Sequence, residues 1–254
     1  MKHKSISVIT TFYNAQDTLE DTISSILKQD YENLQMIFVD GKSTDRSLEI
    51  VNQYANQFKD LKVISEPDNG IYDGMNKGIC AANGDIVAIL NADDYFEPGA
   101  LTAINELFES DADVVAATTQ KVYNDGRLFE KVLRSEMPPL SPMSSAISHP
   151  SVFVKRGIYD TVGMFNTKYK ISADYDFISR ATNAGAKIVY SDIVTTNMRI
   201  GGVSDSIKFH TKKNIEHILI GLSHISSFSN RIKHIGYVAK KYIYGLLKYI
   251  GILK

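Results

Sequence analysis

The sequence has little cysteine and no long apolar stretch. Its 254 residues include one cysteine, Cys80, which excludes a disulfide framework and a cysteine-based zinc site and is typical of a reducing compartment. No uninterrupted apolar run follows residues 1–5, so we expect no signal peptide and a cytoplasmic location. With 44% hydrophobic and 22% charged residues, the chain is neither disordered nor a multi-span membrane protein.

Acidic residues are scarce near the C-terminus. The net charge of the whole chain is −1, yet residues 207–254 contain nine Lys and Arg residues against one acid, Glu216. A basic tail on an acidic body indicates an anionic partner. The tail shows no interleaved base-stacking groove and no known motif for nucleic acid, so we expect no nucleic acid partner.

The first 118 residues alternate strand-like and helix-like patterns. Apolar and β-branched runs predict strands, whereas apolar residues spaced by three and four predict helices. Repeated βα units indicate an α/β fold with a mostly parallel, doubly wound sheet and right-handed crossovers. The expected strands are 5–12, 34–39, 61–65, 85–90 and 113–118, and the expected helices are 15–29, 45–58, 71–82 and 99–109.

The alternation stops after residue 118. Asn124-Asp-Gly126 lies between two strand-like runs and predicts a hairpin. A Pro/Ser-rich loop at 137–145 follows, then a helix at 177–184 and a strand at 188–198. We therefore divide the chain into a first part at 1–118, a second part at 119–205 and a helical tail at 206–254.

Polar residues gather where three of the predicted strands end, at 10–14, 40–45 and 91–94. In an open parallel sheet, ligands bind outside the carboxyl ends of the strands, so we expect one shared cleft. Asp and Asn also end strands as turn or cap residues, which is the alternative for each segment taken singly. Asp93 and Asp94 offer hard oxygen ligands that suit Mg²⁺ or Mn²⁺, and such a cation would let an acidic cleft bind a nucleoside diphosphate.

In their order and spacing, several segments resemble the inverting family-2 glycosyltransferases of the GT-A fold. Residues 68–78 are similar to the branch of that family that builds bacterial surface polysaccharides. The resemblance implies a GT-A nucleotide-diphospho-sugar transferase fold, with a nucleotide-binding half at 1–118 and an acceptor half at 119–205. The segments that carry it are 8–14, 39–45, 66–70, 91–94 and 173–176, within residues 5–200.

The resemblance also implies roles for individual residues. Asp94 corresponds to the metal ligand and Asp93 to its ribose-binding neighbour. Asp40 corresponds to the residue that reads the nucleobase, with Phe12 packing on the base, although Phe12 as a core aromatic is the alternative. Uracil and guanine both remain open as the base. The other implied substrate-binding residues are Thr11, Asn14, Asp68, Asn76, Lys77, His149 and Arg199, of which Lys77 on a solvated face, His149 in a structural role and Arg199 in a surface turn are the alternatives.

Inversion at the anomeric carbon requires one base for the acceptor hydroxyl, and the resemblance assigns this role to Asp174. Asp176 is the competing residue. On a helix the two side chains would point about 200° apart, so both cannot face the cleft equally. Asp174 could also serve as a helix N-cap.

Residues 235–253 predict an amphipathic helix with lysines opposite its apolar face. Lys240, Lys241 and Lys248 interrupt any membrane-spanning run, so we expect the helix to lie on an anionic membrane surface. Packing on the protein's own core and a homodimer contact are the alternatives. The expected apolar face comprises Ile235, Val238, Ala239, Tyr242, Ile243, Leu246, Ile250 and Leu253.

Together these patterns predict a metal-dependent inverting glycosyltransferase at the inner face of the cell membrane. It would move a sugar from a nucleotide-diphosphate donor, with UDP favoured, to a lipid-linked or surface saccharide. Two other functions stay open: a catalytically silent nucleotide-binding scaffold at the membrane, and a nucleotidyltransferase. The second would normally show a Gly-rich basic phosphate loop, and Thr10–Asn14 is not one.

Overall fold

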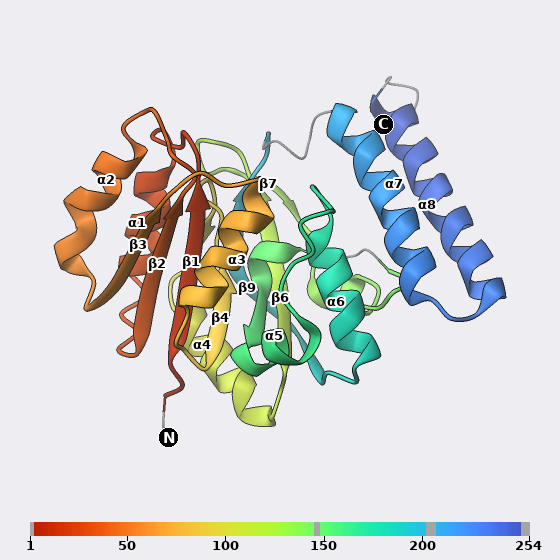
Figure 1. Cartoon of the computed structure of the whole chain (residues 1–254), viewed down its shortest axis with the longest axis horizontal. Coiled ribbons are helices and arrows are strands. Elements are labelled where there is room, and N and C mark those ends of the chain that lie inside the picture. The colour runs from red at the N-terminus through yellow and green to blue at the C-terminus, as the bar shows by residue number, and fades with distance from the viewer. Residues whose placement is uncertain (1–2, 145–147, 202–206, 250–254) are drawn as a thin grey trace.

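A computed structural model of the chain describes residues 3–144, 148–201 and 207–249 (Figure 1). Its centre is one mixed sheet with the strand order β3-β2-β1-β4-β8-β6-β9-β5, and β7 pairs with β6 beside this path. The strands are β1 (Ile6–Phe12), β2 (Leu34–Asp40), β3 (Asp60–Ser65), β4 (Ile86–Ile89), β5 (Tyr95–Phe96), β6 (Val114–Val122), β7 (Leu128–Lys131), β8 (Val152–Lys155) and β9 (Ile188–Arg199).

Helices cover both faces of the sheet, which is why its central strands are apolar on both sides. One core joins the sheet to α1, α2 and α4, and a second core on the other face joins it to α3, α5 and α6. These six helices are α1 (Leu19–Leu27), α2 (Ser47–Tyr54), α3 (Ile71–Ala81), α4 (Ala100–Leu107), α5 (Arg156–Val162) and α6 (Ala173–Asn183).

The predicted parallel βα units are confirmed in the first half of the chain. Strand β1 pairs in parallel with β2 and β4, and β2 pairs in parallel with β3. The carboxyl ends of β1 and β2 are in register, with Phe12 opposite Asp40. The polar segments that follow these strands therefore emerge at one edge of the sheet.

Strand β8 was not predicted. It lies between β4 and β6 and runs antiparallel to both. It is only four residues long and follows the Pro/Ser-rich loop, so no βα rhythm marks it. The predicted hairpin after residue 120 is present, because β6 and β7 pair antiparallel across residues 123–127.

The tail forms two helices rather than the one predicted at 235–253. Helix α7 (Ile207–His224) and helix α8 (Phe228–Tyr249) lie side by side, and α7 contacts α6 (Figure 1). The predicted apolar positions Ile250 and Leu253 lie outside the described residues. Within the described ranges, no helix has the length and apolar character needed to cross a membrane.

Candidate active site

Asp40 ends β2 with its side chain almost fully buried. Its Oδ1 accepts a hydrogen bond from the Ser43 backbone N–H at 2.8 Å, and its Oδ2 accepts one from the Ser65 hydroxyl at 2.8 Å. Each carboxylate oxygen has a second lone-pair direction, so Asp40 has acceptor capacity left, but its side chain is 1% exposed and a ligand would reach it only after the atoms that cover it move. The two bonds fix the orientation of the carboxylate before any ligand arrives.

Asp68 approaches Asp40's segment from the loop before α3. A Cβ atom on Gly41 would lie 2.6 Å from Asp68 Oδ2, and one on Gly74 would lie 3.2 Å from Thr11 Cγ2 and 3.4 Å from Asp68 Oδ2. Glycine at both positions lets this loop and α3 approach the strand ends closely. The structure therefore brings Thr11, Asp68 and the segment of Asp40 close together, and one cleft shared by all three stays a prediction.

Lys77 holds the Asp68 loop in place. Its Nζ donates to the Pro67 carbonyl at 2.6 Å and lies 3.0 Å from a Glu66 carboxylate oxygen. Asn14 plays a similar part at the end of β1, because its Oδ1 accepts from the Thr44 N–H at 2.8 Å. Both residues thus shape the rim of the predicted cleft through protein contacts.

The aromatic residue available to a nucleobase differs from the predicted one. The Phe12 side chain is 5% exposed and packs edge-on against Phe38 in the core, so the core alternative describes it. Tyr13, the next residue, is 62% exposed. The signal lies in the alternation of β1, because Ile6, Val8 and Phe12 share one core while Ile9 belongs to the other.

Asp93 and Asp94 follow β4, and only one of the two carboxylates is accessible. The Asp94 side chain is fully buried; its Oδ2 accepts from the Asn91 amide at 2.9 Å and its Oδ1 from the Arg199 backbone N–H at 3.1 Å. Burial, with a smaller contribution from the charge of Asp93, raises the pKa of Asp94 to about 8. Burial also raises the pKa of Asp93, which is half-buried. Of the two acids only Asp93 is partly exposed, and the metal-binding role of Asp94 stays a prediction.

The described residues contain no group of three or more His, Cys, Asp or Glu side chains arranged to hold a metal. Mg²⁺ commonly uses one or two carboxylates and completes its shell with substrate phosphates and water. Asp93 fits that pattern, because it supplies a hard oxygen beside a second acid. The fully buried Asp94 and the half-buried Asp93 both have raised pKa values, and a cation between them would favour their charged forms.

Arg199 is committed to protein contacts. Its guanidinium donates to the Asp93 carbonyl at 2.7 Å, pairs with Asp21 at 2.5 Å and lies 5.1 Å from the centre of the Tyr95 ring. Arg199 thus fastens the acidic segment after β4, and its substrate-binding role stays a prediction.

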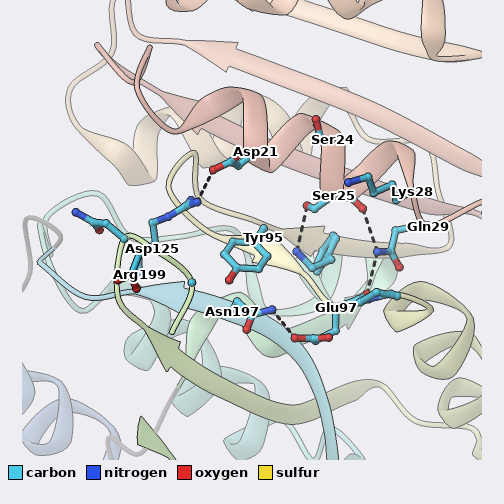
Figure 2. Close-up of a pocket in the computed structure, with 14 residues that line it drawn as sticks. Asp21, Ser24, Ser25, Lys28, Gln29, Tyr95, Glu97, Asp125, Asn197 and Arg199 are labelled. Atoms are coloured by element: carbon cyan, nitrogen blue, oxygen red, sulfur yellow. Dashed lines mark hydrogen bonds and ion pairs between the residues drawn. The ribbon is translucent and has the colours of Figure 1, made fainter. Parts of the chain in front are cut away.

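Arg199 also borders a polar groove of about 460 Å³ between α1, β5 and the turn at 124–126 (Figure 2). Figure 2 shows Tyr95 and Glu97 facing this groove, with Asp21 above Arg199. The groove is lined by neither Asp40, Asp68 nor Asp174. We place the candidate site at the strand ends, because Thr11, Asp40 and Asp68 lie there and none of them lines the groove.

Asp174 lies in the first turn of α6, whose N-cap is Ser172, so it is not the N-cap itself. Its Oδ1 accepts from the Tyr175 N–H at 2.9 Å and lies 3.1 Å from the Tyr72 hydroxyl, which belongs to the first turn of α3. Asp176 points elsewhere. It is buried and pairs with Arg180 at 2.9 Å and with His224 of α7 at 2.8 Å.

His149 lies near Asp174, and Asn76 belongs to α3. Burial lowers the pKa of His149, and the charge of Asp174 opposes that shift. His149 and Asp174 line one small cavity with Phe165. Asn76 exchanges two hydrogen bonds with the backbone of Phe165, at 2.9 and 3.0 Å, so its amide holds this wall and is not free for a substrate. The sequence reasoning missed Tyr72, because its contact to Asp174 joins residues 102 positions apart.

Comparison with known proteins identifies the family and the fold. Residues 7–176 match Glycosyl transferase family 2. A PGL/p-HBAD biosynthesis glycosyltransferase of Mycobacterium bovis is 29% identical over 212 residues, which cover 79% of each chain. Chondroitin synthase of Pasteurella multocida is 26% identical over 223 residues, which cover 86% of this chain and 23% of that protein.

Two solved structures are similar in fold. S. aureus TarS 1–349 in complex with UDP-GlcNAc has a TM-score of 0.74 at 20% identity, covering 92% of this chain and 71% of that one. The mannosyltransferase PcManGT from Pyrobaculum calidifontis, in complex with GDP-Man and Mn²⁺, has a TM-score of 0.68 at 16% identity, covering 95% of this chain and 70% of that one. These likenesses show the GT-A fold.

Proposed function

The chain belongs to glycosyl transferase family 2 and is a transferase; from this premise we propose that it is a metal-dependent, inverting glycosyltransferase. Its donor is a nucleotide-diphosphate sugar, with UDP favoured over GDP. Its acceptor is a saccharide that is lipid-linked or part of the cell surface, and the enzyme works at the inner face of the membrane. Of the two other sequence-based functions, the family match disfavours a nucleotidyltransferase, and the silent scaffold is an outcome of the test below.

The nucleotide would lie over the ends of β1 and β2. Asp40 has acceptor capacity left for a base N–H, a charge-assisted hydrogen bond that is stronger than a neutral one. The exposed ring of Tyr13 is available to stack on the base. Asp68, beside Gly41, would accept from a sugar hydroxyl of the nucleoside. These contacts support a nucleoside ligand without deciding between uracil and guanine.

Asp93 would hold the cation, with Asp94 buried behind it; because burial raises the pKa of Asp94 to about 8, its carboxyl group is mostly protonated at neutral pH when no cation is bound. When bound, Mg²⁺ or Mn²⁺ neutralises the charge that develops on the departing diphosphate. Arg199 holds the backbone of this acidic segment through its bond to the Asp93 carbonyl. The protein's own part is therefore to fix one accessible carboxylate against the donor phosphates.

Asp174 is the proposed base. It accepts the proton of the acceptor hydroxyl as that oxygen bonds to the anomeric carbon, while the bond from this carbon to the diphosphate oxygen breaks. One observation carries the proposal: the first turn of α3 contacts Asp174 through Tyr72, and Gly74 in the same helix adjoins Asp68. Asp174, the proposed base, and Asp68, a proposed contact of the nucleotide, thus both lie close to α3.

The test uses the full-length chain with a panel of UDP- and GDP-sugars, and it measures release of nucleoside diphosphate with Mn²⁺ and with EDTA. We expect release from at least one UDP-sugar with Mn²⁺ and none with EDTA. Turnover in EDTA would contradict the role of Asp93, and turnover of GDP-sugars alone would contradict the preference for UDP. Tight UDP binding in calorimetry without turnover of any donor would support the scaffold instead.

A further inference from the structure

We propose that the α7–α8 hairpin docks on an anionic membrane surface through one apolar face to which both helices contribute. This inference takes one point from the proposed function, namely that the acceptor is lipid-linked. We call this surface the outer face of the hairpin and define it by Ile215 and Leu219 of α7 and by Phe228, Ile232, Ile235 and Ile243 of α8.

Helix α8 has two apolar sides, where the sequence predicted one. His234 and Val238 are buried, and the His234 Nε2 atom lies 2.9 Å from the His217 carbonyl of α7. Ile232 and Ile243 are 56% and 55% exposed, respectively. An α-helix turns by about 100° per residue. On this basis the exposed apolar positions of α8 are centred about 100° around the helix axis from the buried positions, so they form a separate stripe. Packing on the protein's own core, the alternative to a membrane surface, thus accounts for Val238 but not for Ile243.

Helix α7 repeats this division. Glu216, His217 and Ile220 are buried, whereas Ile215 and Leu219 are 54% and 52% exposed. The two helices pack closely, since a Cβ atom on Gly221 would lie 2.1 Å from His234 Nε2. The two helices run antiparallel, and on each of them the exposed stripe lies on the same side of the line along which α7 and α8 contact each other. The two stripes therefore face the same way, away from the sheet.

Lysines border the outer face on both sides. Lys212 follows the α7 stripe, and Lys233 and Lys240 follow the α8 stripe, all three exposed. Long lysine stems can lie along an apolar surface while their ammonium groups reach lipid phosphates. The one acid in residues 207–254, Glu216, is turned inward, where it accepts hydrogen bonds from the backbone N–H groups of residues 170–172.

This charge pattern selects a lipid surface over a second copy of the chain. In a twofold dimer through the outer face, the same lysine-bordered patch would meet itself and bring like charges together. An anionic bilayer offers apolar depth at the centre of the face and negative headgroups at its edges. The lysines beside each apolar stripe also suit a hairpin that lies flat in the interface between water and lipid.

The test is co-sedimentation of the full chain with vesicles of mixed phosphatidylglycerol and phosphatidylcholine, and with vesicles of phosphatidylcholine alone. We expect binding to the anionic vesicles that weakens with added salt, and little binding to the neutral ones. The triple variant Leu219→Ser, Ile232→Ser and Ile243→Ser should weaken partitioning by at least about tenfold. The double variant Lys233→Gln and Lys240→Gln should weaken it by about fivefold for each lysine.

The matched control is Leu128→Ser on β7, which removes an equally exposed leucine away from the hairpin and should leave partitioning unchanged. Wild-type protein that ignores anionic vesicles, or a triple variant that binds them as well as wild type, would overturn the inference. So would a dimer in light scattering that the triple variant converts to monomer. Calorimetry with UDP and Mn²⁺ on the same proteins separates the two proposals, because nucleotide binding should persist in every variant.

Discussion

Tyr13 and Phe12 are adjacent in the chain but predict opposite responses to substitution. Tyr13→Ala removes a ring that is 62% exposed next to the Phe12–Asp40 strand pair, so it should change the free energy of unfolding very little. Base–aromatic stacking is worth about 1–3 kcal/mol per base, which corresponds to a loss of about 5- to 150-fold in UDP affinity. Tyr13→Phe keeps the ring and should keep most of the affinity.

Phe12→Leu is the companion variant. Phe12 is 5% exposed and packs against Phe38, so a smaller apolar side chain should cost up to about 1.5 kcal/mol of stability. Because the ring faces the core, UDP affinity should stay unchanged. Calorimetric titration with UDP and Mn²⁺ gives the affinities, and urea unfolding of the same proteins gives the stabilities.

The reasoning from strand alternation is refuted by either of two results. One is a Tyr13→Ala protein that binds UDP as tightly as wild type. The other is a Phe12→Leu protein that loses UDP affinity while its unfolding curve stays unchanged. In that second case the sequence-based role of Phe12 would stand, and its burial would have to open when nucleotide binds.

Three further predictions follow from burial and charge. Asp174→Asn should lower transfer by about 10²- to 10⁴-fold in steady-state assays with UDP affinity intact, whereas Asp176→Asn should mainly lower the unfolding free energy; loss of activity from the second alone would reverse the assignment. In EDTA, the free energy of unfolding should fall between pH 6.5 and pH 8 by up to about 1.4 kcal/mol per pH unit. The raised pKa of Asp94 causes this fall, because the folded state holds one more proton than the unfolded state over this window. Melting temperatures that rise over the same window would contradict the prediction. Gly78→Ala puts a methyl group 2.4 Å from a side chain of β1 and should cost about 1–3 kcal/mol in urea unfolding, whereas Gly157→Ala, in open space on α5, should gain about 0.5–1 kcal/mol.

The parts of the fold that local patterns specify were predictable. Continuous apolar runs such as residues 34–39 marked strands buried on both faces, and acids after these runs marked the edge where the strands end. Asp68, which lies beside the segment of Asp40, was identified only through the family resemblance. Strand β8 was not predictable in the same way, because four residues give too short a pattern and its place between β4 and β6 depends on pairing with distant strands.

Accessibility of individual side chains was the least predictable property of the site. The sequence places Asp93 and Asp94 at the same strand end, but the Asn91 amide and the Arg199 N–H cover Asp94 only after β9 has folded beside this segment. Arg199 itself lies 106 residues from the carbonyl it binds. Such contacts carry no local signal, so a motif can identify the acids without identifying which of them can reach a ligand.

The tail illustrates how a distant element supports the proposed base. Glu216 of α7 accepts three backbone hydrogen bonds, at 2.9, 3.0 and 3.0 Å, from Lys170, Ile171 and Ser172, directly before Asp174 in α6. Without that carboxylate the three N–H groups would have to find new acceptors at the helix start. The helix that contributes Ile215 and Leu219 to the proposed docking surface is therefore also the helix that fixes the segment leading to Asp174. A sequence pattern that shows only a basic, amphipathic tail cannot reveal this connection, because the acid that makes it is a single residue among nine bases.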